Sequence, residues 1–341
     1  MPSHALTHYY AILRGDEKVK YLRTKAIMVD LDLGKDGPEL WRTHDALLGA
    51  NEPHGGGVSL LDLKVELGRR MLQRCALCER RCLVNRSEGE SGHCGVLEPR
   101  VSSEFIHMGE EPDLVPSYTI FFSGCTFNCV YCQNWDISTR PGAGDYLDPV
   151  TVARMIEARS DSDTRAGTLR ALLGRARNVN WVGGDPTSNL PFILEVLRES
   201  RANLPQVWNS NMYLTEDAMK LLDGVIDVYL TDFKYGNDKC ALRLSNAKDY
   251  MRIVERNHRL ARGQAEMIIR HLVLPGHIEC CTRPALTWIA ENLDEVVVNV
   301  MSQYRPEHRA GQFEEIARPL RMSEYNRARE IADELGLQLC D

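Results

Sequence analysis

Three features are missing from this sequence of 341 residues, and each absence excludes a class of protein. It has no run of about 18 or more apolar residues, so we expect no transmembrane helix. The first six residues lack the basic start and apolar stretch of a signal peptide, so we expect a cytoplasmic protein. Net positive charge is also missing, since the formal charge is −7 and the pI is near 5.9. That charge argues against a chain-wide basic surface for nucleic acid.

Cysteine, in contrast, is abundant. The chain has eleven cysteines, and seven of them fall in two tight clusters whose spacing is typical of metal thiolate sites rather than of disulfides. We interpret Cys240, Cys280, Cys281 and Cys340 as ordinary buried or surface thiols. The adjacent pair Cys280 and Cys281 offers two metal ligands, but nothing else in the sequence supports a site there.

From residue 118 onward, short apolar runs alternate with amphipathic stretches, which predicts parallel βα units. We expect strands at 119–123, 179–182, 206–208, 225–231, 267–273 and 295–300. We expect helices at 149–159, 189–202, 215–222, 248–262, 283–292 and 323–335, and an earlier helix at 59–72. Residues 51–57 are a turn-rich linker. Six such units fit an open, partial (β/α) barrel as well as a doubly wound sheet.

The second cysteine cluster along the chain, Cys125, Cys129 and Cys132, has the spacing C-x3-C-x2-C and follows the first predicted strand. Three thiolates on one loop can hold three corners of a [4Fe–4S] cluster, which normally takes four. An iron without a protein ligand is free to bind a substrate or cofactor. The alternative is a structural zinc loop, but such sites are usually closed by four ligands. The neighbouring residues Asn128 and Gln133 are poor candidates for the fourth.

This loop resembles the signature loop of the radical S-adenosylmethionine (radical SAM) enzymes. In that superfamily SAM chelates the open iron, and an electron from the cluster cleaves SAM to a 5′-deoxyadenosyl radical that abstracts hydrogen from a substrate. The resemblance covers about residues 75–335 and favours the α/β fold of a partial (β/α)6 TIM-like barrel with an N-terminal cysteine-rich extension. We therefore predict an N-terminal extension at 1–70, a four-cysteine segment at 71–116 and the barrel at 117–341. A reductant such as a ferredoxin or flavodoxin is also implied.

The resemblance extends to positions that contact SAM in the family. Tyr131 matches an aromatic residue that contacts the adenine, and Gly183-Gly184-Asp185 resembles the "GGE" element that binds the SAM amino group, with Asp for the commoner Glu. The segment from Arg270 to Gly276 resembles an "R-x-x-V-x-P-G" element whose Arg contacts SAM. The cofactor-binding residues that the resemblance implies are Tyr131, Asn134, Gly183, Gly184, Asp185, Asn211, Asp232, Lys234, Arg270 and Asn299.

The first cluster along the chain is Cys75, Cys78, Cys82 and Cys94. Four thiolates within twenty residues indicate a metal site, and zinc, a mononuclear iron and an auxiliary [4Fe–4S] cluster all accept four thiolates. His93 is a further candidate ligand in place of one cysteine.

The branch of the superfamily that the chain resembles is the uncharacterised one similar to pyruvate formate-lyase activating enzymes. Genuine activators commonly carry His-Asn after the third cysteine, whereas this chain has Gln133-Asn134. We expect an oxidoreductase active without oxygen that abstracts hydrogen from a protein or peptide. The alternatives are a small-molecule radical transformation or radical methylation; cobalamin stays open, since family members bind it without an obvious motif. The non-enzyme alternative is an iron–sulfur or zinc protein for electron transfer or interaction.

Overall fold

The structure is a computed structural model that describes residues 4–48, 56–160 and 175–340. The predicted linker therefore lies mostly outside the described residues. Within the described ranges, no helix combines the length and the apolar character needed to cross a membrane.

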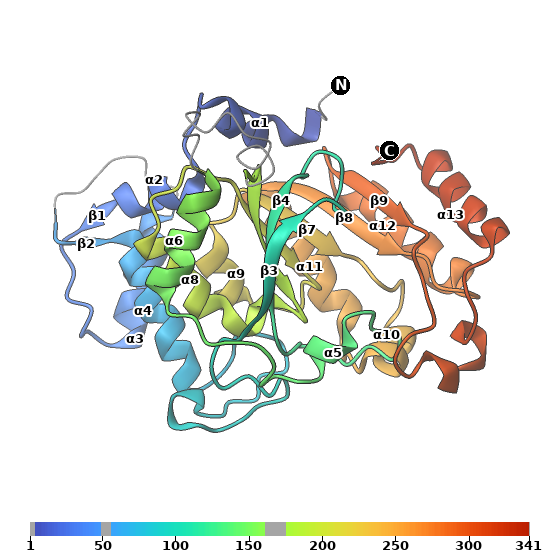
Figure 1. Cartoon of the computed structure of the whole chain (residues 1–341), viewed down its shortest axis with the longest axis horizontal. Helices are drawn as coiled ribbons and strands as arrows, with labels where there is room; N and C mark the ends of the chain where they lie inside the picture. The colour runs from blue at the N-terminus through green and yellow to red at the C-terminus, as the bar shows by residue number, and fades with distance from the viewer. Residues whose placement is uncertain (1–3, 49–55, 161–174, 341) are drawn as a thin grey trace.

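A seven-stranded sheet with the strand order β3-β4-β5-β6-β7-β8-β9 forms the centre of the fold (Figure 1). The six strands from β4 onward pair in parallel and in sequence order, and β3 adds to β4 as an antiparallel edge strand. Among the described residues β9 does not pair with β3, so the sheet is not a closed barrel. The predicted α/β fold of six parallel units is confirmed. The strands are β3 (Val101–His107), β4 (Ser117–Phe122), β5 (Asn178–Gly183), β6 (Gln206–Ser210), β7 (Val228–Asp232), β8 (Glu266–Leu272) and β9 (Val297–Met301).

Each of the six predicted parallel strands coincides with an observed strand, because their apolar runs are buried on both faces. The prediction omits β3, whose sequence VSSEFIH is mostly polar and whose burial alternates, as expected for an edge strand.

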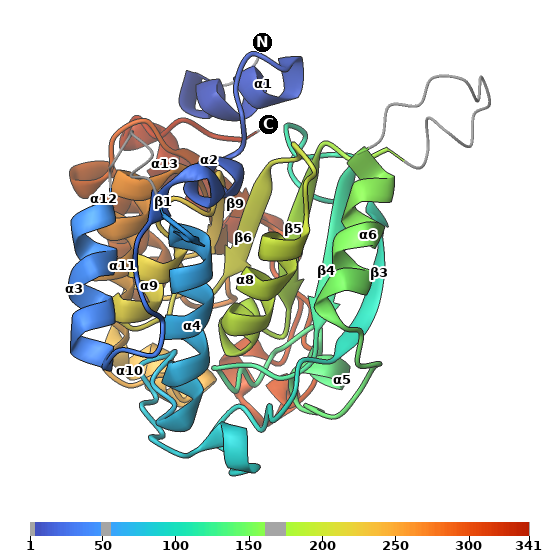
Figure 2. The same ribbon diagram turned by 90° about the vertical axis from the view of Figure 1, so that its left-hand side faces the viewer.

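Helices connect the strands and cover the outer face of the sheet (Figure 2). All seven predicted helices are present within a few residues of their expected bounds, but the prediction omits α10, which lies between β7 and α11. The connecting helices are α6 (Pro149–Ser160), α8 (Leu190–Glu199), α9 (Glu216–Leu222), α10 (Asp238–Ser245), α11 (Tyr250–Gln264) and α12 (Arg283–Asn292), with α13 (Met322–Glu334) after β9.

The described residues of the first seventy, 4–48 and 56–70, pack onto this core. Helix α4 (Leu60–Gln73) starts at a capping box between Ser59 and Asp62 and packs against α8, where a Cβ on Gly68 would lie 3.5 Å from Leu194. The other elements before α4 are α1 (Thr7–Arg14), α2 (Lys20–Ala26), α3 (Gly37–Leu47) and a two-stranded sheet of β1 (Met28–Val29) and β2 (Val58–Ser59). The predicted division of the chain at residues 70 and 116 stays a prediction.

The amino-terminal end of the strands is closed by an apolar cluster. Ala5, Leu6 and Tyr9 pack there with Leu114 and with residues of the strands, Val207, Val228, Leu230, Ile268 and Val297. The opposite, carboxyl edge carries the segment between α4 and β3, the short helix α5 (Trp135–Ser138) and α10 (Figure 2). Ligands of parallel α/β folds bind at the carboxyl ends of the strands, so this edge is where the site is expected.

Candidate functional site

The loop with Cys125, Cys129 and Cys132 leaves β4 at the carboxyl edge, and all three thiols are free and partly buried. Its shape is fixed by backbone hydrogen bonds to α10. The N–H of Asn128 donates to the carbonyl of Ser245 at 3.1 Å, and the N–H of Val130 donates to the carbonyl of Leu244 at 2.8 Å. Helix α10 therefore holds the middle of the cysteine loop.

Each sulfur atom of this loop has a hydrogen-bonding neighbour. The Cys129 sulfur lies 2.9 Å from Ser245 Oγ, and the Cys132 sulfur lies 3.3 Å from Ser138 Oγ. The Cys125 sulfur accepts from the N–H of Phe127 at 3.3 Å, and Asn211 Nδ2 lies 3.9 Å away. Hydrogen bonds to ligating sulfur are one means by which proteins tune iron–sulfur clusters.

The three thiols fit an iron–sulfur cluster chemically. Burial raises the pKa of Cys125, and the nearby carboxylate of Asp185 adds to the effect. Burial also raises the pKa of Cys129 to about 11, although the ammonium of Lys234 acts in the opposite direction. Since metal ligands must be thiolates, a strongly bound cation is what would hold these sulfurs deprotonated.

The separation of the sulfur atoms is wide in both cysteine clusters. Among the described residues, no three sulfur atoms of either cluster lie within 4.8 Å of one another. A zinc tetrahedron with Zn–S bonds of about 2.3 Å brings its sulfur atoms to about 3.8 Å from one another. The spacing thus favours a centre larger than one zinc ion.

A chain of hydroxyl groups connects Tyr131 to the cysteine loop. The Tyr131 hydroxyl lies 2.8 Å from that of Tyr235, which lies 2.6 Å from Ser245 Oγ, the group next to the Cys129 sulfur. Tyr131 is buried, whereas Asn134, the other predicted contact on this loop, is exposed at the start of α5. Tyr235 and Ser245 were missed by the sequence analysis, because no motif marks them and Ser245 is 116 residues from Cys129.

The predicted glycine pair packs against the start of the cysteine loop. Gly183 has φ +135°, and a Cβ there would lie 2.1 Å from the carbonyl oxygen of Phe122; a Cβ on Gly184 would lie 2.1 Å from that of Gly124. The N–H of Gly184 donates to Phe122 and that of Asp185 to Gly124. The end of β5 can therefore lie directly on the loop only because two glycines are present.

The Asp185 carboxylate joins the ends of β5 and β6. Its Oδ1 accepts from the N–H of Thr187 at 3.0 Å, and its Oδ2 accepts from Ser210 Oγ and the N–H of Asn211, both at 3.0 Å. Burial raises the pKa of Asp185 although these bonds oppose the shift. Asn211 is in turn bonded to Thr126, next to Cys125. Asp185 thus positions a neighbour of the cysteine loop.

We expect Asp185→Asn to destabilise the protein by about 1–3 kcal/mol, because one amide N–H₂ replaces an oxygen that accepts from two donors in a buried site. Chemical denaturation of the anaerobically purified protein measures the change. The matched control is Asp294→Asn at an exposed position. Equal stability of the two variants would contradict the role assigned to Asp185.

Asp232 and Lys234 lie at the carboxyl end of β7. Lys234 Nζ donates to Asp232 Oδ2 at 2.6 Å. Burial would lower the pKa of Lys234, but the charges of Asp232 and Cys129 raise it above its usual value. A charged ammonium therefore lies beside the cysteine loop, and the predicted contact of Asp232 and Lys234 with SAM stays a prediction.

Arg270 of β8 and Asn299 of β9 are paired in register in adjacent strands, and both contact Glu111. Arg270 forms ion pairs with Glu110 and Glu111, which come from the turn between β3 and β4, and Asn299 Nδ2 donates to Glu111 at 2.9 Å. Asn180 of β5 also donates to Glu110 at 3.0 Å. The guanidinium of Arg270 is thus already paired with two glutamates that the sequence analysis missed. Its predicted contact with SAM stays a prediction.

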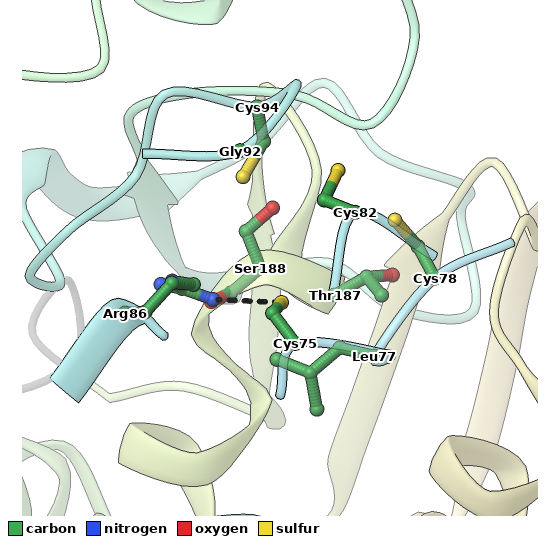
Figure 3. A pocket seen from close by; sticks show the side chains of 9 residues that line it. All are labelled: Cys75, Leu77, Cys78, Cys82, Arg86, Gly92, Cys94, Thr187 and Ser188. Carbon is green, nitrogen blue, oxygen red and sulfur yellow. Dashed lines mark hydrogen bonds between the residues drawn. The ribbon is translucent and has the colours of Figure 1, made fainter. Parts of the chain in front are cut away.

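Cys75, Cys78, Cys82 and Cys94 gather around one small cavity (Figure 3). Burial raises the pKa of Cys78, and interaction with the other three thiols adds to the shift. His93 does not line the cavity; its backbone N–H donates to the Cys82 sulfur at 3.2 Å. Gly92 lies so close that a Cβ there would be 3.1 Å from that sulfur.

Two polar atoms that line this cavity have no hydrogen-bond partner among the described residues, although they are buried. They are Arg86 Nε and Thr187 Oγ1. The same guanidinium places Nη1 4.0 Å from the Cys75 sulfur (Figure 3). Buried donors without partners are rare, so they indicate a missing acceptor, as the sulfides of an iron–sulfur centre would be.

The two cysteine clusters are directly connected. Arg80, between Cys78 and Cys82, donates from Nε to the carbonyl of Thr126 at 2.9 Å, and Thr126 follows Cys125. The carbonyl of Cys94 lies against Gly124. Thr187 and Ser188, which line the four-cysteine cavity, follow Asp185 in the chain.

Comparison with known proteins agrees with this geometry. The profile of the family described as the Radical SAM superfamily matches residues 119–289. An uncharacterised protein of Methanocaldococcus jannaschii, MJ0674, is 44% identical over 348 residues, which cover 98% of this chain and 98% of the relative.

Solved structures show a partial likeness. SuiB of Streptococcus suis bound to S-adenosylmethionine has a TM-score of 0.47 and 12% identity, covering 63% of this chain and 47% of SuiB. Methylornithine synthase (PylB) has a TM-score of 0.46 and 12% identity, covering 97% of this chain and 77% of PylB. This chain thus spans less than half the length of SuiB. On the family match and the relative of nearly full length, the chain belongs to the radical SAM superfamily.

Proposed function

We propose that this radical SAM enzyme abstracts hydrogen from a protein or peptide, with Cys125, Cys129 and Cys132 holding its catalytic [4Fe–4S] cluster. The observation that carries the proposal is the loop itself: three half-buried thiols at the carboxyl edge of an open sheet, beside the ammonium of Lys234. When bound, such a cluster supplies the electron that cleaves SAM to a 5′-deoxyadenosyl radical, which takes hydrogen from the substrate.

The residues around the loop have separate roles in this proposal. Lys234 offers a cation to the SAM carboxylate, and Asp232 holds that ammonium in place. Asp185 and Asn211 hold the carboxyl ends of β5 and β6 against the cysteine loop. The groups that would bind the SAM amino group are therefore in position before SAM binds. Tyr131, Asn134, Gly183, Gly184, Arg270 and Asn299 complete the predicted set of SAM-binding residues.

The substrate assignment follows from the shape of the sheet. Because β9 does not pair with β3 among the described residues, the sheet does not close into a barrel, and an incomplete barrel leaves one side at which an extended peptide could enter. A small-molecule transformation or a radical methylation is the alternative.

We propose an auxiliary [4Fe–4S] cluster at Cys75, Cys78, Cys82 and Cys94, because the sulfur spacing exceeds that of a zinc site and two buried donors face the cavity without acceptors. We expect Cys78→Ser to lower the iron and sulfide of the reconstituted protein by about four atoms each per chain, one cubane. Metal and sulfide analysis measures this. A loss of one zinc with unchanged iron would assign the site to zinc instead.

The proposed function is tested by anaerobic reconstitution followed by incubation with SAM and a strong reductant. Formation of 5′-deoxyadenosine, quantified by chromatography, is the expected result, and hydrogen-isotope transfer from candidate peptides to that product then identifies the substrate class. A protein that binds zinc but assembles no iron–sulfur cluster would overturn the proposal.

A further inference from the structure

Three side chains of types that bind metals meet where α10 contacts the turn after β8. Cys240, His277 and Cys280 place one ligand atom each within 4.8 Å of one another, and no other such group occurs among the residues that the structure describes. Cys240 lies in α10, and the other two lie in the turn that follows β8. Neither iron–sulfur candidate contains any of these residues.

The histidine of this group is already oriented. His277 is 4% exposed, and its Nδ1 lies 2.8 Å from the carbonyl oxygen of Pro275, to which it must donate. That bond leaves Nε2 as the unprotonated nitrogen, which is how metal-binding histidines are usually held.

The backbone around the two cysteines is also specialised. Ile278–Thr282 forms a single turn of π-helix, in which the N–H of Thr282 bonds to the carbonyl of His277. Such turns are uncommon and frequently occur at functional sites. Asn237, at the start of α10, donates from Nδ2 to the carbonyl of Cys280 at 2.6 Å and so fixes this turn against the helix.

We propose that Cys240, His277 and Cys280 bind a zinc ion. Two thiolates and an imidazole are typical zinc ligands, and a tetrahedral site with bonds of about 2.0–2.3 Å needs ligand atoms slightly under 4 Å apart. The observed group is thus close to zinc size, whereas both other cysteine clusters are wider. The sulfur of Cys281 lies 3.9 Å from that of Cys280, so Cys281 is a candidate for the fourth zinc ligand. Binding releases the thiol protons to solvent.

A metal here would connect α10 to the turn after β8. The last residue of α10, Ser245, contacts the Cys129 sulfur, and its last turn holds Asn128 and Val130 of the catalytic loop. Zinc would therefore stabilise the helix against which the iron–sulfur loop is built, without itself contacting the proposed SAM site.

The test is metal analysis of anaerobically purified protein from zinc-supplemented cells. We expect about one zinc per chain, lost in Cys240→Ser, His277→Gln and Cys280→Ser but retained in the matched control Cys340→Ser. Iron and sulfide should stay unchanged in Cys280→Ser, since Cys280 is exposed and its replacement tolerable for folding. Zinc retained by all three ligand variants, or absent from wild-type protein, would overturn the proposal.

Cobalt provides a second readout that does not depend on activity. Exchange of the zinc for Co²⁺ should give a thiolate-to-cobalt charge-transfer band in wild-type protein that disappears in Cys280→Ser. Detection by mass spectrometry of a Cys240–Cys280 disulfide, with no zinc bound, would instead show a redox pair and refute the site. Neither the cobalt spectrum nor the disulfide analysis depends on SAM cleavage. Failure of the zinc proposal can therefore be distinguished from failure of the proposed radical SAM function.

Discussion

Replacement of Cys129 by alanine should abolish the formation of 5′-deoxyadenosine from SAM. The side chain supplies one of three thiolates, and a cubane with only two protein ligands is not retained, so we expect a loss of about four irons per chain. Cys129 is also the sulfur that Ser245 and Lys234 surround, so no nearby thiol replaces it. Liquid chromatography of the reaction and iron analysis measure both effects.

The control for this experiment is Cys340→Ala, which removes a thiol far from the loop in the sequence. Iron at the four-cysteine cavity should persist in Cys129→Ala, because its ligands come from a separate segment. Undiminished SAM cleavage in Cys129→Ala would show that the catalytic cluster is bound elsewhere. Loss of all iron would show that the two centres assemble only together.

The parts of the fold that follow from local sequence are the parts that the sequence analysis predicts. Strands such as β7, VYLTD, are buried continuously and have the apolar runs of a parallel sheet. Strand β3 and helix α10 could not be found in this way. Edge strand β3 is mostly polar, and α10 is an eight-residue helix with only three buried residues.

The same distinction holds for the sites. Each cysteine cluster is contained in twenty residues or fewer, so its spacing alone predicts a metal site, and the structure gathers the four cysteines as expected. In contrast, Arg270 meets Glu111 across 159 residues, and Cys240 meets His277 across a strand and a helix. Such contacts depend on the path of the chain through the fold, which neither composition nor periodicity encodes.

Arg270→Leu should have the largest effect on stability of any substitution outside the cysteines. Burial would lower the pKa of Arg270, but Glu111 and Glu110 raise it above its usual value, so the buried guanidinium stays charged. Removing it leaves two buried carboxylates, of Glu110 and Glu111, without their cation. Breaking a buried ion pair in this way costs roughly 3–5 kcal/mol. Urea denaturation measures the loss, and the exposed Arg327→Leu, whose ion pairs are at the surface, should change stability little.

The dependence of this effect on pH has a definite sign. Burial alone would raise the pKa of Glu110, but Arg270 and the imidazole of His107, 3.2 Å away, outweigh it and hold the pKa at about 2. In the wild type, Glu110 therefore contributes about 3 kcal/mol above its ordinary pKa near 4.5, and this contribution disappears as the pH falls toward 2. In Arg270→Leu only His107 still opposes burial, which is the largest single influence on the pKa of Glu110. The carboxyl should therefore take up a proton on folding, and stability should rise as the pH falls from 7 toward 5. A variant whose stability stays level from pH 7 to 5, as an ionised wild-type Glu110 requires, would show that Arg270 is not what keeps Glu110 ionised.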